Sequence, residues 1–154
     1  MIRKFVINTM WLLLMIVISG LVYIRMAPDD LTSIHNIPAS SAVPGKQESF
    51  NAGIIISERV KAKPQAVLAD LHKIITATPR TTVLVGSVEE GMISYVTRSK
   101  VFGFPDYTTI RVLPEEDYSR LTIYSRLRFG RYDFKVNSRR LYKWMDAIKA
   151  ENSF

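Results

Sequence analysis

The chain has 154 residues, and its 21 Lys and Arg residues against 14 Asp and Glu residues give it a formal net charge of +7. It contains no cysteine, which excludes disulfides, thiolate zinc sites and thiol catalysis. Its two histidines are too few for a His-rich metal site, and neither a phosphate-loop motif nor a dinucleotide fingerprint occurs. We therefore predict no metal and no cofactor, and composition alone points to no reaction.

An uncharged, apolar run occupies Phe5–Ile24 near the N-terminus. A helix of about 20 residues crosses the hydrocarbon core of a bilayer, so we predict that residues 1–26 form a cytoplasmic tip and a retained transmembrane anchor that contacts the lipid bilayer through residues 5–24. The alternative is a cleaved signal peptide. Its apolar region would be shorter and would end at a small-x-small site, which the exit Tyr23-Ile24-Arg25-Met26 lacks.

The charges that flank this run predict its orientation. Arg3, Lys4 and the α-amino group precede the run, whereas Arg25 alone follows closely. Because basic flanks stay in the cytoplasm, we expect a single-pass protein of the inner (cytoplasmic) membrane, with its N-terminus inside and its C-terminal domain periplasmic. An extracytoplasmic domain meets little DNA, so we expect no nucleic-acid partner despite the positive charge.

Residues 27–49 are predicted to form a Pro/Ser-rich linker, because Pro28, Pro38 and Pro44 interrupt regular structure. Residues 50–154 are predicted to form the soluble domain. Alternating and β-branched segments predict strands at 53–60, 82–88, 92–101, 107–113 and 118–129, with helices between Pro64 and Pro79 and from Asn137 onward. The order β-α-β-β-β-β-α predicts an α+β fold in which a small antiparallel sheet has two helices packed on one face.

The positive charge is concentrated in one stretch, residues 120–143, which holds eight Lys and Arg residues and one acid, Asp133. Without this stretch the chain has 13 basic and 13 acidic residues. In the strand at 118–129, Ser125 lies on the apolar side of the alternation and Arg128 on the polar side. A local excess of positive charge attracts anions or acidic surfaces.

Two motifs in the domain resemble those of a known family. Residues 125–140 are similar to the signature S-x-S-R-x-G-x-x-D-x-G-x-N-x-x-R of the family DUF1499, a domain of unknown function, and the matching residues are Ser125, Arg128, Gly130, Asp133, Asn137 and Arg140. Residues 102–106, Phe-Gly-Phe-Pro-Asp, resemble its motif F-G-F-x-D-D. Leu127, Lys135 and Tyr107 depart from the pattern, and the family's Pro-Asn-Cys-Val-Ser segment is absent. The resemblance implies a bacterial or organellar envelope protein and no established activity.

The residues around this signature allow several interpretations. Gly130 permits a turn, Asn137 is a predicted helix N-cap, and Asp133 is a predicted ion-pair partner of Arg128 or Arg140. A structural ion-pair network, an anion or partner site, and a catalytic role all remain open. The candidate site residues are Ser125, Arg128, Asp133, Asn137, Arg139, Arg140 and Asp106.

Three functions are consistent with these features. The preferred one is a membrane-anchored envelope protein whose domain binds a protein partner or an anionic ligand, without catalysis, through the basic strand–helix edge. The second is an envelope enzyme that uses Asp106, Asp133 and arginines on a phosphorylated or lipid substrate. The third is a structural accessory subunit of a membrane complex, contacted through the apolar helix.

Overall fold

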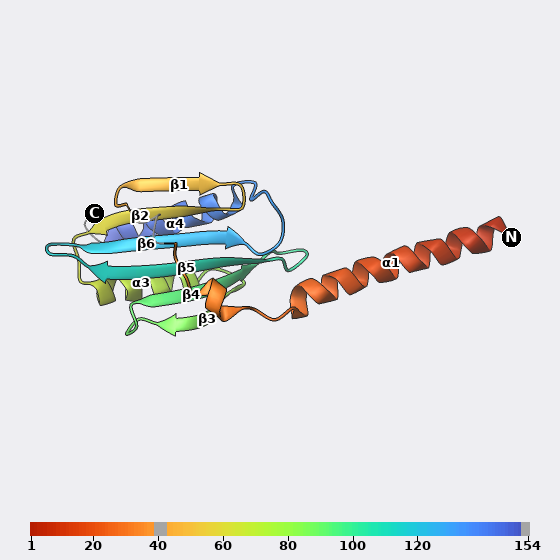
Figure 1. Cartoon of the computed structure of the whole chain (residues 1–154), viewed down its shortest axis with the longest axis horizontal. Helices are drawn as coiled ribbons and strands as arrows, with labels where there is room; N and C mark the ends of the chain where they lie inside the picture. Colours follow the sequence, from red (N-terminus) through yellow and green to blue (C-terminus); the bar gives the residue numbers. More distant parts are fainter. Residues whose placement is uncertain (39–42, 152–154) are drawn as a thin grey trace.

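The structure is a computed structural model that describes residues 1–38 and 43–151. A long helix, α1 (Ile2–Met26), extends from one end of a layered α+β domain (Figure 1). The helix is long and apolar enough to cross a membrane, and none of its residues is buried. The elements of the domain are α2 (Leu31–Ile34), β1 (Lys46–Phe50), β2 (Gly53–Val60), α3 (Pro64–Thr76), β3 (Thr81–Ser87), β4 (Met92–Arg98), β5 (Pro105–Pro114), β6 (Ser119–Leu127) and α4 (Val136–Glu151).

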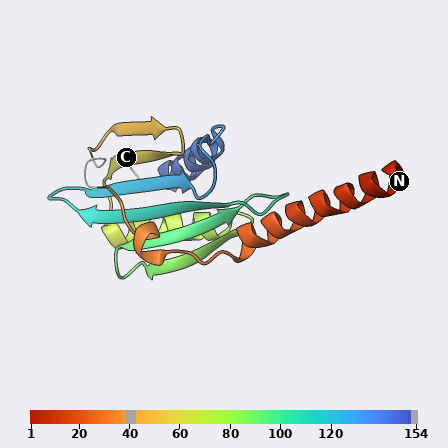
Figure 2. The ribbon, with the colours of Figure 1, turned by 45° about the vertical axis from the view of Figure 1, so that its right-hand side comes forward.

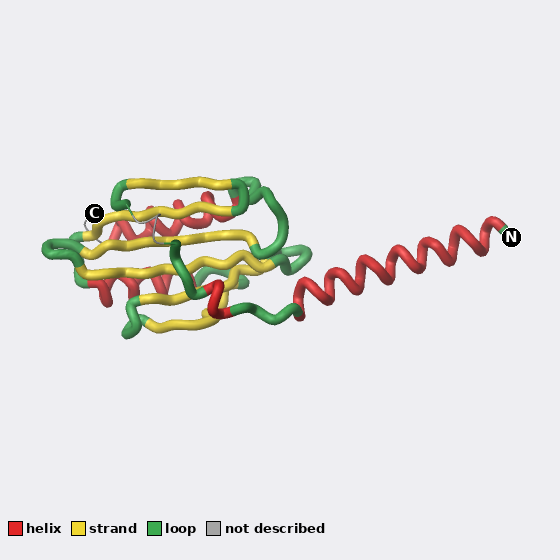
Figure 3. The backbone as a smooth tube through the Cα atoms, viewed as in Figure 1, coloured by secondary structure: helices red, strands yellow, loops and turns green. Residues whose placement is uncertain are grey.

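The six strands form one open sheet in the order β1-β2-β6-β5-β4-β3, and every neighbouring pair is antiparallel. Helices α3 and α4 pack side by side on one face of this sheet (Figure 3). The predicted α+β class, the antiparallel sheet and the two helices on one face are therefore confirmed.

The core lies between the sheet and the two helices. Pro64 begins α3, where its fixed φ suits the first helical turn and its missing N–H has no helical partner to lose. Val67, Leu71 and Ile75 recur at helical spacing, so they share the face of α3 that is buried. Alternation along the strands supplies the opposite side of the core, with Ile54 of β2, Ile110 of β5 and Ile123 of β6 among its members.

Residues 27–49 are more ordered than a linker. Lys46–Phe50 forms the edge strand β1, which pairs with β2, and Asp30 caps the four-residue helix α2 by accepting hydrogen bonds from Thr32 and Ser33. The expectation that prolines exclude regular structure throughout this segment was therefore wrong. Every residue of β1 is exposed, so its sequence lacks the alternation of apolar and polar residues that marks a half-buried strand.

Residues 27–37, which we call the strap, lie against the face of the sheet opposite α3 and α4 (Figure 2). Ile34 of the strap is buried with Val96 of β4 and Tyr107 of β5. The backbone carbonyl of Ile34 accepts hydrogen bonds from Thr109 at 2.7 Å and from Arg126 at 2.7 Å. The strap thus attaches the segment after α1 to the middle of the sheet.

Candidate functional site: a buried polar cluster and a basic groove at α4

Three residues in the connection between β6 and α4 have positive φ angles, in the left-handed region of the Ramachandran plot. Gly130 has φ +100°, which confirms the predicted turn, and Phe134 and Lys135 have φ 48° and 61°. Helix α4 then begins at Val136. These turns bring the first residues of α4 over the ends of β5 and β6.

Asp133, not Asn137, caps the start of α4. Both carboxylate oxygens of Asp133 lie 3.1 Å from the backbone N–H of Asn137, and one of them accepts a further hydrogen bond from the Asn137 side-chain amide at 2.8 Å. Asp133 therefore satisfies a donor that the helix itself leaves unpaired. The prediction that Asn137 is the N-cap was wrong.

The Asn137 side chain is the centre of a buried polar cluster. Its carbonyl oxygen accepts hydrogen bonds from Ser125 Oγ at 3.0 Å and from the guanidinium of Arg140. Ser125 Oγ also lies 2.9 Å from Thr108 Oγ1, so the cluster joins β5, β6 and α4. Because each polar group in such a place needs a partner, these contacts fix how α4 sits on the sheet.

The counter-ion of Arg140 is Asp106 at the start of β5. One guanidinium nitrogen lies 3.3 Å from the carboxylate, and both side chains are 13% exposed. Burial raises the pKa of Asp106 above its ordinary value, although Arg140 opposes the shift and the charge of Asp133 adds to it. Burial likewise lowers the pKa of Arg140. The predicted ion pair between Asp133 and Arg140 was wrong, because Asp106 holds that place.

Arg128 lies on the other face of the sheet, away from this cluster. Its guanidinium pairs with Asp29 of the strap at 2.6 Å and donates to the carbonyls of Ala27 and Pro28. Tyr107 donates a hydrogen bond to the same Asp29 carboxylate at 2.5 Å. The predicted pair of Arg128 with Asp133 was therefore wrong as well. Asp29 was not identified from the sequence as the partner of Arg128, because no local pattern links residues that lie about a hundred positions apart.

Arg139 is exposed and borders a groove between the C-terminal end of α3 and the first turns of α4. We call this the α3–α4 groove; its volume is about 850 Å³. Four basic residues line it, and none of its described lining residues is acidic: Arg80, Arg139, Arg140 and Lys143. Trp144 gives the groove an apolar wall and is held by a hydrogen bond from its indole N–H to Thr78. The arrangement suits an anion that also carries an apolar part.

The seven candidate residues thus divide into three groups. Asp106, Ser125, Asp133, Asn137 and Arg140 meet in the buried cluster, Arg139 faces the groove, and Arg128 holds the strap. The fold and this cluster define a small α+β domain with an open antiparallel sheet, attached to an apolar N-terminal helix. The chain belongs to the family described as Protein of unknown function (DUF1499), which it matches over residues 30–148. No curated protein matches the chain significantly.

Proposed function

We propose that the chain is a single-pass envelope protein whose domain binds an anionic ligand, without catalysis, in the α3–α4 groove. The observation that carries this proposal is the concentration of basic side chains along the groove. Arg80, Arg139 and Lys143 form no ion pair with any residue in the described part of the chain, and Asp106 neutralises only Arg140. An anion in the groove would meet several cations that the fold leaves uncompensated.

The geometry around Arg139 supports a prepared binding surface. Its guanidinium donates hydrogen bonds to the backbone carbonyls of Lys135 and Phe134, at 3.2 and 3.5 Å, so the orientation of the charged group is fixed. Basic groups at the start of a helix are unfavourable beside its positive dipole end, and a bound anion would relieve this repulsion.

The separation of the candidate residues favours binding over catalysis. An enzyme that used Asp106, Asp133 and Arg128 together would need them around one cavity. Asp106 instead pairs with Arg140, Asp133 caps α4, and Arg128 binds the strap on the opposite face of the sheet. The polar groups of these residues are engaged in holding the fold.

Anchoring of the domain by α1 is part of the proposal. The helix is apolar enough to span a bilayer, and the basic flank that precedes it favours an N-terminus inside, which would place the domain in the periplasm. The same exposed helix would serve the alternative role of an accessory subunit, in which a partner helix replaces lipid.

Inorganic phosphate is a suitable probe of the groove. We expect phosphate to raise the melting temperature of the full-length protein in detergent more than chloride does at equal ionic strength. A ligand that binds only the folded state raises the free energy of unfolding by about 2.7 kcal/mol when its concentration is about 100 times its Kd. The double variant Arg139→Gln/Lys143→Gln should lose the difference. The control Lys61→Gln/Lys63→Gln changes two lysines that lie outside the groove and should keep it. Equal effects of the two anions on the unmodified protein would contradict the proposal.

A further inference from the structure

The loop between β4 and β5, residues 99–104, packs beside the last turns of α1. Val101 is 71% exposed and Phe102 is 51% exposed, although both are apolar. Together with Ile18, Leu21 and Val22 of α1 they line a shallow hollow of about 260 Å³. An exposed apolar loop beside an apolar helix is unusual on a surface that faces only water.

The depth at which this contact would lie in a bilayer follows from the position of the α1 residues. Leu21 belongs to the uncharged run that ends at Ile24, so it lies within the apolar layer when α1 spans a bilayer. Val101 and Phe102 approach that part of the helix. They would therefore reach the lipid at the boundary between headgroups and acyl chains, where aromatic rings are favoured.

Behind the loop lies a second hollow, of about 450 Å³, which we call the basic hollow. Four cations line it, and no carboxylate occurs among its described lining residues: Arg25, Arg80, Arg98 and Lys100. Arg80 Nε donates to the carbonyl of Arg98, and Arg98 donates to the carbonyl of Gly103, so the wall of the hollow is ordered. Gly103, with φ +73°, allows the loop to turn against the Arg25 side chain.

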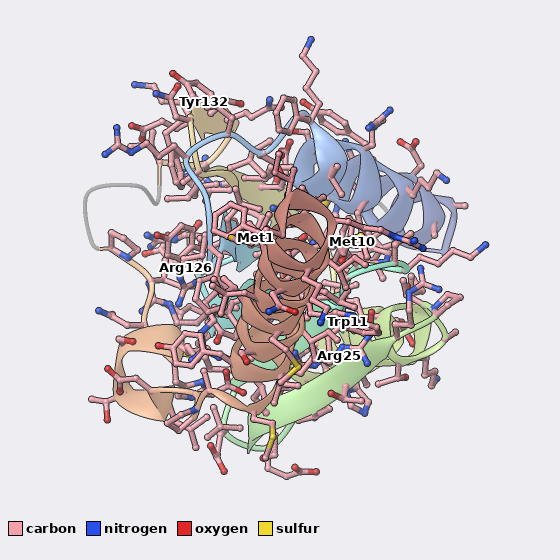
Figure 4. The ribbon with its side chains drawn as sticks, turned by 90° about the vertical axis from the view of Figure 1, so that its right-hand side faces the viewer. Met1, Met10, Trp11, Arg25, Arg126 and Tyr132 are labelled. Carbon is pink, nitrogen blue, oxygen red and sulfur yellow. The ribbon has the colours of Figure 1, made fainter. Side chains whose placement is uncertain are left out.

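Charge is distributed unequally between the two ends of the domain. Figure 4 looks along α1 onto the end that carries the helix, where Arg25 marks the edge of the basic hollow. The opposite end carries the β3–β4 and β5–β6 turns, with Glu89 and Glu90 in the first and residues 115–117, Glu-Glu-Asp, in the second (Figure 1). Lys61 and Lys63 lie beside the second turn, so acids outnumber the bases among these residues. The basic end of the domain therefore faces the place where a bilayer around α1 would begin.

We propose that this end of the domain sits on the bilayer, with Val101 and Phe102 in the interface and the basic hollow holding the phosphate of an anionic phospholipid. The inference rests on the anchoring by α1 proposed above. It concerns a different surface from the α3–α4 groove, although Arg80 borders both.

Fluorescence quenching tests the depth of the loop, because a chain without cysteine accepts a single label at any chosen site. The full-length variants Val101→Cys, Leu14→Cys and Glu116→Cys are labelled with bimane and placed in nanodiscs that contain nitroxide-labelled phosphatidylcholine. We expect strong quenching at 14, clear quenching at 101 and none at 116. Quenching at 14 without quenching at 101 would overturn the inference and leave the anchor intact, whereas no quenching at 14 would overturn the anchor itself.

Lipid composition tests the basic hollow. Quenching at 101 should increase when phosphatidylglycerol replaces part of the phosphatidylcholine. Lys100→Glu should weaken this preference of the loop for an anionic bilayer by at least about fivefold, because the loss of one basic residue near an anionic surface alone has about this effect. The matched variant Lys63→Glu, on the loop before α3 and away from both hollows, should retain the preference. If quenching at 101 is equal in both lipid compositions when Lys100 is intact, the phospholipid assignment is overturned.

Discussion

At the scale of single residues, the acids of the two family motifs stabilise the start of α4. Arg139 and Arg140 lie in its first turns, where exposed cations cost about 0.3–1 kcal/mol each against the helix dipole. Asp133 caps the helix and Asp106 neutralises Arg140, so two carboxylates offset this cost. The sequence indicated that such compensation was needed. It did not indicate which acid serves which function, because Asp106 comes from a strand 34 positions before Arg140.

The structure shows the surroundings of two residues that depart from the family pattern. Tyr107, which stands where the pattern has a second Asp, donates a hydrogen bond to Asp29 and is buried under the strap. Lys135 stands where the pattern has Gly, and its φ is 61°. Glycine adopts this backbone conformation without a steric penalty, whereas a residue with a Cβ pays about 1–2 kcal/mol.

Lys135→Gly is therefore expected to stabilise the domain. Relief of the left-handed strain outweighs the greater chain entropy that glycine loses on folding, and the free energy of unfolding should rise by about 0.5–1 kcal/mol. Urea unfolding followed by circular dichroism measures the change. Lys61→Gly, at an exposed position whose φ is not positive, should lower the free energy of unfolding. A loss of stability in both variants would show that Lys135 is not strained.

At the scale of elements, predictability follows the hydrophobic pattern. The strands and helices that contribute to the main core were predicted because burial imposes alternation or helical spacing on them. Strand β1 was missed since all five of its residues are exposed. The place of the strap on the sheet could not be predicted because its contacts are long-range: Ile34 is buried with Val96 and Tyr107, which follow it by 62 and 73 positions. Alternation along the strand predicted at 118–129 did indicate that Ser125 and Arg128 point to opposite faces, and accordingly Ser125 joins the buried cluster whereas Arg128 binds the strap.

The strap should loosen when Arg128 is removed. In Arg128→Met the ion pair with Asp29 and the hydrogen bonds to Ala27 and Pro28 are lost, and the Asp29 carboxylate stays partly buried with only Tyr107 as a side-chain donor. We expect faster amide hydrogen exchange in residues 29–37 and little change in α3, because the strap lies on the other face of the sheet. Arg131→Met, at an exposed position in the same loop, serves as the control. Unchanged exchange in the strap would show that its remaining contacts with the sheet hold it without Arg128.

At the scale of the whole molecule, the four cations of the basic hollow gather at the end of the domain from which α1 emerges. They come from α1, the α3–β3 connection, β4 and the loop after it, and their gathering depends on the sheet order, which places separate loops at one end. The sequence shows the charge excess of residues 120–143, but Arg25, Arg80, Arg98 and Lys100 lie outside that stretch. Their convergence is a property of the fold.

In the proposed arrangement, the orientation of α1 decides which leaflet this basic end would meet. Arg3 and Lys4 before the span against Arg25 after it predict an N-terminus inside, so a reporter that is active only in the periplasm should be active when fused after Phe154. Arg3→Asn/Lys4→Asn leaves Arg25 as the nearest basic side chain and should lower the activity of the fusion at equal expression, as part of the population inverts. Lys61→Asn/Lys63→Asn removes the same charge far from the span and should leave the activity unchanged. An expressed but inactive fusion of the unmodified chain would place the domain in the cytoplasm, and the basic hollow would then face the inner leaflet of the membrane.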